Sequence, residues 1–300
     1  FNQSNLSGLA EAGTVNITSL TGGSLNLSNG SLSGTNINLA NLNTSAGTTL
    51  TSSTGVTVAP VTGTTNTIAG VLAGAGYLTK NEAGTLVLSG QNTYSGVTNI
   101  NAGVLSISAD DNLGAVPGAT TANSLNINGG TLLVTNDVTI NTKRGISLGA
   151  NGGTFDIDAT KTLIYGGVIA NASGEIGALT KKGAGTFRLS GANSFGGATA
   201  INAGELNVTG SLSDSTAVTV TSGATYNLGN SDTIASIAGS GLANINTYDL
   251  TIGGSASTTF AGEIRGSGNL IHNSSGILTL SGANTYTGDT NINAGTLRLT

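Results

Sequence analysis

The chain has 300 residues, of which 48 are Gly, 8% are charged and 4% are aromatic, and its formal net charge is −5. It contains no Cys, so a disulfide scaffold, a zinc finger and a thiol enzyme are excluded. Nine Lys and Arg against 14 Asp and Glu argue against nucleic acid as a partner, because phosphates require a basic surface.

Short runs in which apolar and polar residues alternate recur along the whole chain. Alternation with period two, bounded by Gly, Asn and Ser, predicts strands of a few residues. No segment has the composition of a helix, so we expect almost no α-helix and no membrane-spanning segment. In chain order the runs are 15–17, 25–27, 37–39, 125–127, 146–148, 155–157 and 278–280.

The apolar runs return at a longer interval, which indicates how the strands pair. Val15 and Ile17 return as Ile37 and Leu39, a shift of about 22 residues, and other runs return after about 21 or 23. Such a recurrence predicts an all-β fold, a parallel β-solenoid with about 21–23 residues per coil. In that fold the inward side chains stack as aliphatic columns, and Gly and Asn occupy the corners.

A longer repeat is superimposed on this pattern. Segment 84–108 returns without gaps as 185–209 and 276–300, and twelve of its 25 columns are identical in all three copies. Alternate apolar and variable columns indicate one packed and one solvated face. The predicted core positions are Leu88, Ile100, Leu105, Leu189, Ile201, Leu206, Leu280, Ile292 and Leu297. The predicted turn positions are Gly90, Asn92, Gly96, Gly103, Gly191, Asn193, Gly197, Gly204, Gly282, Asn284, Gly288 and Gly295.

This unit, with the lead-in Leu-Thr-Lys-Lys-Gly-Ala-Gly at 179–185, resembles the passenger-associated transport repeat of bacterial autotransporters. The third copy departs from the family in its lead-in, at 270–276, but matches in its body. The pieces at 68–71, 165–169 and 260–264 also resemble what commonly precedes the repeat. The resemblance implies a right-handed, single-stranded parallel β-helix passenger, secreted through the outer membrane of a Gram-negative bacterium to the cell surface or beyond.

The resemblance covers only part of the chain, so the organisation is an expectation. We expect one continuous β-helix over 1–300, with repeat-poor coils at 1–65. Transport-repeat segments are expected at 66–108, 165–209 and 259–300, separated by intervening coils at 109–164 and 210–258. Because the chain begins with Phe1 and stops inside an alternating run, we interpret it as a piece of a longer protein.

Few residues are candidates for chemistry, and each has a structural alternative. Asp156 and Asp158 share one face of a strand and could bind a metal ion such as Ca²⁺ or act as a glycosidic acid and base. A polar outer face is the interpretation we favour, and we favour the same for Asp110 and Asp111. His272 is the only imidazole, occupies the position of Lys80 and Lys181 in the other copies, and is expected in an exposed basic position. No catalytic residue and no cofactor site is predicted.

Two further sets of repeat residues could serve binding or packing. Tyr94, Phe195 and Tyr286 are equivalent and could form a carbohydrate platform, although local packing at a corner is favoured. The repeat asparagines are expected to bond within their own turns.

The function suggested by these features is a non-catalytic surface or extracellular scaffold that serves adhesion, aggregation, or a biofilm matrix or filament. We expect self-association, end to end or side by side, and a host or matrix ligand of unknown identity, without membrane insertion by this segment. The alternatives are a β-helix polysaccharide lyase or hydrolase, and a passive stalk that presents another domain.

Overall fold

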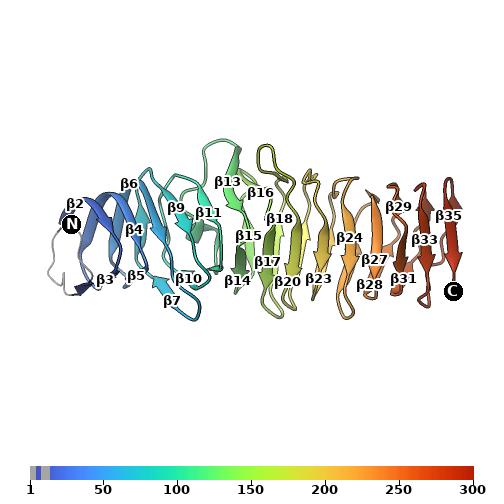
Figure 1. The fold of residues 1–300 in the computed structure, drawn as a ribbon, viewed down its shortest axis with the longest axis horizontal. Coiled ribbons are helices and arrows are strands. Elements are labelled where there is room, and N and C mark those ends of the chain that lie inside the picture. The colour runs from blue at the N-terminus through green and yellow to red at the C-terminus, as the bar shows by residue number, and fades with distance from the viewer. Residues whose placement is uncertain (1–4, 8–13) are drawn as a thin grey trace. The chain divides into compact units, whose positions relative to one another are not determined.

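The computed structural model describes residues 5–7 and 14–300. The chain forms two compact units, Phe1–Ile146 and Ser147–Thr300, and the boundary falls within strand β16 (Arg144–Leu148). Within each unit the strands of successive coils lie side by side (Figure 1). Apart from strands, the described residues form one short 3-10 helix, η1 (Asp110–Leu113), and no α-helix. The prediction of an all-β parallel solenoid is confirmed.

In the first unit all the strands except β15 form two parallel sheets, in which a strand pairs with its equivalent one coil later. One sheet has the order β1-β3-β5-β7-β10-β12-β14 and the other β2-β4-β6-β9-β11-β13, with β8 also paired to β6. The strands of this unit are β1 (Asn5–Ser7), β2 (Thr14–Thr21), β3 (Ser24–Leu27), β4 (Ser31–Leu39), β5 (Asn41–Thr44), β6 (Thr49–Val58), β7 (Thr65–Ile68), β8 (Val71–Ala73), β9 (Tyr77–Lys80), β10 (Thr85–Leu88), β11 (Thr98–Ile100), β12 (Val104–Ile107), β13 (Thr121–Ile127), β14 (Thr131–Val134) and β15 (Val138–Ile140).

In the second unit three parallel sheets surround the core. Their orders are β17-β20-β22-β24-β27-β30-β33-β35, β18-β21-β23-β25-β28-β31 and β26-β29-β32-β34. The strands of this unit are β17 (Gly153–Ile157), β18 (Thr162–Tyr165), β19 (Ile169–Asn171), β20 (Leu179–Lys182), β21 (Thr186–Leu189), β22 (Thr199–Ile201), β23 (Glu205–Val208), β24 (Ala217–Val220), β25 (Thr225–Leu228), β26 (Asp232–Ile234), β27 (Ser236–Gly239), β28 (Leu242–Asn246), β29 (Leu250–Ile252), β30 (Thr258–Phe260), β31 (Glu263–Gly266), β32 (Leu270–His272), β33 (Ile277–Leu280), β34 (Thr290–Ile292) and β35 (Thr296–Leu299).

The length of a coil varies more than the apolar recurrence predicted. Leu20 pairs with Ile37, whereas Thr98 pairs with Leu125, so the second of these coils is much longer than the first. The predicted return of Val15 and Ile17 at Ile37 and Leu39 is wrong, because Val15 pairs with Leu32 and Ile17 with Gly34. Each coil carries apolar runs on more than one sheet, so a fixed interval can join runs that do not pair. Leu42 lies in the other sheet and pairs with Leu25.

The core of each unit consists of stacked aliphatic side chains. In the first unit Leu25, Leu42, Leu86, Leu105 and Leu132 occupy inward positions of one sheet, with Asn66 between Leu42 and Leu86, and all five leucines are buried. Burial of one such side chain contributes about 1.5–3 kcal/mol. Because the strands are parallel and in register, each coil covers the inward apolar side chains of the previous coil.

The described part of the chain offers no helical membrane anchor. None of its helices has the length and hydrophobicity needed to cross a bilayer.

Candidate functional site at the repeat corner

Each copy of the 25-residue repeat contains an eight-residue segment without a named strand, which we call the repeat corner. It spans 89–96, 190–197 and 281–288 in the three copies. In every copy the strands on either side pair with strands of the same copy. Leu78 pairs with Thr98 and Thr85 with Val104, so one repeat closes a coil of about 20 residues on itself.

Two glycines of the repeat corner lie directly against glycines of the preceding coil. A Cβ on Gly90 would overlap the carbonyl oxygen of Gly70, and one on Gly96 would overlap that of Gly76. The other copies have the same arrangement, with Gly191 on Gly167, Gly197 on Gly177, Gly282 on Gly262 and Gly288 on Gly268. The sequence pieces that precede each repeat therefore supply the glycine on which its corner rests.

A third glycine of each repeat is required by backbone conformation. Gly103, Gly204 and Gly295 have φ values of +64°, +62° and +67°, in the left-handed region. A side chain there is strained, and its Cβ would also overlap carbonyl oxygens of the previous turn.

The repeat asparagine connects coils rather than bonding only within its own turn. Asn92 Oδ1 accepts the N–H of Leu72 at 2.8 Å, and its Nδ2 donates to Asn112 O at 2.6 Å. Asn193 Oδ1 accepts the N–H of Ile169 at 3.0 Å, and Asn284 Oδ1 accepts that of Ile264 at 2.9 Å. Bonds within the turn occur as well, from Nδ2 of these two residues to Gly191 O and Gly282 O. The prediction of bonding within the turn therefore holds for Asn193 and Asn284 but not for Asn92. The bonds between coils were not predicted; they form because the corner has no strand and the amide takes the place of a ladder carbonyl.

The repeat aromatic residue packs inside the corner. Tyr94 and Phe195 are buried, which confirms the packing interpretation for these copies and excludes them as an exposed platform. Tyr94 Oη and Thr98 Oγ1 are 2.7 Å apart, and burial raises the pKa of this tyrosine to about 12. Phe195 has no hydroxyl, and Thr199 bonds instead with Thr216 at 3.1 Å.

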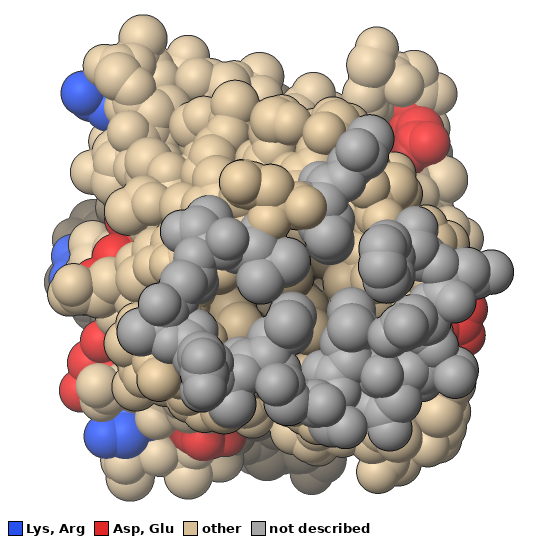
Figure 2. Space-filling view, turned by 90° about the vertical axis from the view of Figure 1, so that its left-hand side faces the viewer, with Lys and Arg blue, Asp and Glu red and all other residues tan. Residues whose placement is uncertain are grey.

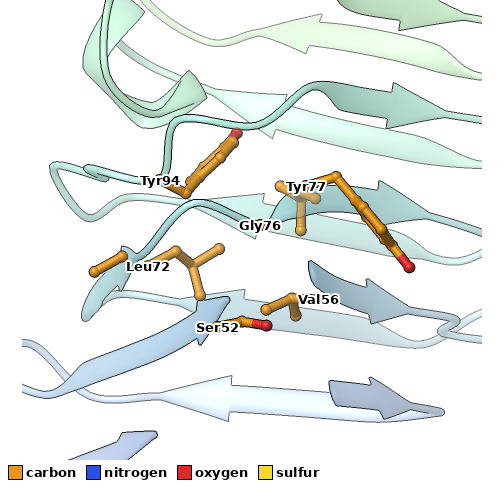
Figure 3. Close-up of a pocket in the computed structure, with 8 residues that line it drawn as sticks. Ser52, Val56, Leu72, Gly76, Tyr77 and Tyr94 are labelled. Atoms are coloured by element: carbon orange, nitrogen blue, oxygen red, sulfur yellow. The ribbon is translucent and has the colours of Figure 1, made fainter. Parts of the chain in front are cut away.

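The space beside Tyr94 is closed rather than open for a ligand. In Figure 3 a narrow recess lies between Tyr94, Leu72 and the β6 residues Ser52 and Val56, and it is too small for a water molecule. Tyr77 points away from Tyr94 and covers Gly55. In this copy the corner serves packing, not small-molecule binding.

The lysine of the lead-in is buried, which corrects the expectation of an exposed basic position. Lys80 and Lys181 are fully buried, and His272, in the same position of the third copy, is 1% exposed. Lys181 Nζ donates to the carbonyl oxygens of Lys182, Gly183 and Ala203 at 2.6, 2.7 and 3.2 Å. Lys80 makes the equivalent three bonds. Period-two alternation could have predicted this, since Leu78 and Lys80 share one face of their strand.

The ammonium group thus binds a turn whose carbonyls point inward. Burial lowers the pKa of Lys80 to about 8, and the charge of Glu82 opposes this. Burial also lowers the pKa of Lys181 to about 8, against the charges of Asp156 and Glu205. Both groups are therefore mostly protonated at neutral pH, when each can donate three hydrogen bonds. His272 offers less, because Nε2 lies 3.3 Å from Gly276 O and Nδ1 has no hydrogen-bond partner.

The predicted core positions differ between copies in burial. Leu88, Ile100, Leu105, Leu189, Ile201, Leu206 and Leu280 are buried. Ile292 is 53% exposed and Leu297 is partly exposed. Their strands β34 and β35 are the last of their sheets among the described residues, so no later rung covers them.

The candidate acidic residues do not form a cluster. Asp156 is partly buried and Asp158 is exposed, and both occupy outward positions beside the inward Phe155 and Ile157. Over residues 5–7 and 14–300 no group of three His, Cys, Asp or Glu side chains is placed to hold a metal ion. Asp110 instead forms an ion pair with the buried Arg144, with Oδ1 and Nε 2.9 Å apart.

Comparison with known proteins identifies the repeat. Segments 78–107, 179–208 and 270–299 match the family described as the passenger-associated-transport-repeat. Over 155 residues, half of this chain, the sequence is 39% identical to the adhesin BmaC autotransporter of Brucella suis biovar 1 (strain 1330). The matched part is 4% of the length of that protein. No solved structure matches the chain.

Proposed function

We propose that this chain, which carries three passenger-associated transport repeats, is a non-catalytic stretch of an autotransporter passenger that serves as an adhesive scaffold on the cell surface. The observation that carries the proposal is the threefold recurrence of one repeat corner within a parallel β-solenoid. The similarity to an adhesin of the autotransporter class adds support.

The distribution of polar side chains favours a scaffold over an enzyme. Outward positions on neighbouring coils carry Asn and Thr, which bond along the sheet, as Asn244 Nδ2 does to Asn227 Oδ1 at 3.0 Å. The imidazole of His272 is buried beneath its own turn and is not accessible to a substrate. Lys80 and Lys181, whose pKa values are lowered by burial, donate hydrogen bonds to carbonyl oxygens of the coil. Their role is therefore structural.

We further propose that the repeat promotes folding of the chain during secretion. Each copy closes a coil of about 20 residues on its own strands, so it can form before any distant part of the chain is present. A chain that emerges gradually would then acquire three stable coils on which neighbouring coils assemble.

A secretion experiment tests this function. The chain is fused to the outer-membrane translocator of a known autotransporter and displayed on a non-adherent Gram-negative strain. We expect surface display and increased attachment of the cells to a matrix-coated surface, relative to the translocator alone. Display without any gain in attachment would contradict the adhesive role. Failure of display only after the Gly90, Gly191 and Gly282 positions are replaced by Ala would support the role of the repeat in secretion.

A further inference from the structure

The ladder of the first unit is interrupted between β5 and β7. Strand β3 pairs with β5 through four residue pairs, and β7 pairs with β10 through four. Between β5 and β7 only Thr44 and Ile68 are paired. The main-chain ladder is therefore interrupted along the rest of these two strands, which nevertheless stay side by side.

Side-chain acceptors of β5 take the place of main-chain carbonyls at the interruption. Asn43 Oδ1 accepts the N–H of Thr67 at 2.8 Å, in place of a main-chain carbonyl. Thr44 Oγ1 accepts the N–H of Gly70 at 2.9 Å. Because Oδ1 of Asn43 is engaged, the orientation of its amide is set and Nδ2 is directed away from that bond.

A groove of about 290 Å³ opens at this interruption. Asn26, Asn43 and Thr67 succeed one another on neighbouring coils, and Ser28 and Ser45 follow at the next corner. The exposed side chains are Asn26, Ser28 and Ser45, while Thr44 is buried at the base. We call these residues the amide groove; its complete lining is Asn26, Leu27, Ser28, Asn43, Thr44, Ser45 and Thr67.

None of the side chains that line the groove is ionisable. Its side chains offer amide and hydroxyl groups, which both donate and accept hydrogen bonds. Between Ala12 and Thr79 the sequence contains no Asp, Glu, Lys, Arg or His. In Figure 2, which faces the N-terminal side, the charged side chains of the described residues lie near the edges of the view. An ionic ligand would find no countercharge here, whereas a ligand rich in hydroxyls would find matching partners.

We propose that the amide groove binds a neutral sugar unit of a polysaccharide or glycan. This rests on the adhesive function above and adds a ligand class to it. The groove is at the lower end of the size range of ligand sites, which suits one or two sugar rings and not a folded protein segment. Binding is through hydrogen bonds from Asn43 Nδ2 and from the exposed Asn26 and Ser45 side chains.

The test uses the chain 1–300 in solution with defined probes. Hexasaccharides of glucose, galactose, mannose and N-acetylglucosamine are titrated by calorimetry and by saturation-transfer NMR, with hexagalacturonate as the acidic counterpart. We expect at least one neutral hexasaccharide to bind and the affinity to fall at least tenfold in the double variant Asn26→Ala, Ser45→Ala. The matched control Asn38→Ala removes an exposed amide from β4, outside the groove, and should leave the affinity within twofold. Thermal unfolding of each variant verifies that the fold is retained.

Three results would overturn the proposal: no binding of any neutral hexasaccharide, binding of hexagalacturonate alone, or equal loss of affinity in the Asn38→Ala control. The attachment experiment separates this proposal from the proposed function. Cells that attach although no sugar binds contradict the groove and leave the adhesive role intact. Sugar binding by the groove without attachment of the cells contradicts the adhesive role and leaves the groove intact.

Discussion

Gly90 lies against Gly70 of the preceding coil so closely that any side chain at Gly90 would overlap the carbonyl oxygen of Gly70. The N–H of Gly90 meanwhile bonds to Ile68 O, so the corner cannot move outward without losing main-chain contacts. In the other two copies the equivalent glycines, Gly191 and Gly282, lie in the same way against Gly167 and Gly262 of the preceding coil.

Replacing Gly90 by Ala should therefore destabilise the first unit by about 2–3 kcal/mol, since a methyl group must displace backbone and not a flexible side chain. The measurement is urea denaturation followed by circular dichroism. Gly118→Ala is the matched control, because a Cβ at Gly118 meets nothing within 4 Å. Equal stability of the two variants would show that the corner can relax around a methyl group.

The buried lysine provides a second prediction. Lys181→Met keeps the length of the side chain but leaves three inward carbonyls without their donor, which should cost about 2–4 kcal/mol. Lys182→Met, at the exposed neighbouring position, should change the free energy of unfolding by less than about 0.5 kcal/mol. If both variants unfold at the same denaturant concentration, the three hydrogen bonds contribute nothing to stability.

The third copy allows the opposite substitution. His272→Lys places an ammonium group where Asn273, Ser274 and Ala294 supply carbonyls equivalent to those around Lys181. We expect the melting temperature to rise, with a gain of about 1 kcal/mol, because a ring nitrogen without a partner is replaced by a satisfied donor. A lower melting temperature would mean that the third copy has adapted its turn to the imidazole.

Asn66 interrupts the leucine column of the first unit. It pairs with Leu86, is buried, and its Nδ2 has no hydrogen-bond partner. Asn66→Leu restores the aliphatic rung and should stabilise the unit by about 1–2 kcal/mol. The same change at the exposed Asn38 is the control and should give no gain. Differential scanning calorimetry provides the comparison, and a destabilised Asn66→Leu protein would show that the amide has an essential partner.

A prediction of pH dependence follows from Asp232, which performs the role of a repeat asparagine in a coil that lacks the repeat. Its Oδ1 accepts the N–H of Leu212 at 3.2 Å, and Tyr226 Oη donates to Oδ2 at 2.8 Å. Burial raises the pKa of Asp232 from 3.8 to about 6, although hydrogen bonds from Tyr226, Leu212 and Thr233 oppose the shift.

Between pH 4 and 6 the folded state thus holds a proton that the unfolded chain has released. The free energy of unfolding contributed by this group therefore falls as the pH rises through that window, by about 2–3 kcal/mol in total. Asp232→Asn keeps an acceptor for Leu212 and a polar partner for Tyr226 and should abolish this dependence. Denaturation at pH 4, 5, 6 and 7 measures it, and parallel pH profiles for the two proteins would contradict the assignment.

Much of this arrangement could be predicted from the residues alone. The alternation around Leu88 and Leu105 indicated which side chains are inward, and the repeat located the corners at Gly90 and Gly103. These features are local, because the period of a strand and the conformational freedom of glycine depend on a few neighbouring residues. The inward position of Lys80 follows the same rule and was missed because a charged residue was assumed to be exposed.

The residues alone predict the repeating unit, which consists of parallel coils with aliphatic inward positions and glycine corners. The pairing of residues from different coils becomes known only from the folded chain. Neither the partner of Asn92 on the preceding coil nor the interrupted ladder between β5 and β7 beside Asn43 could be predicted from spacing, because corners of unequal length give coils of unequal length. The contacts between coils depend on the sum of these lengths, and no local rule of period or propensity specifies that sum.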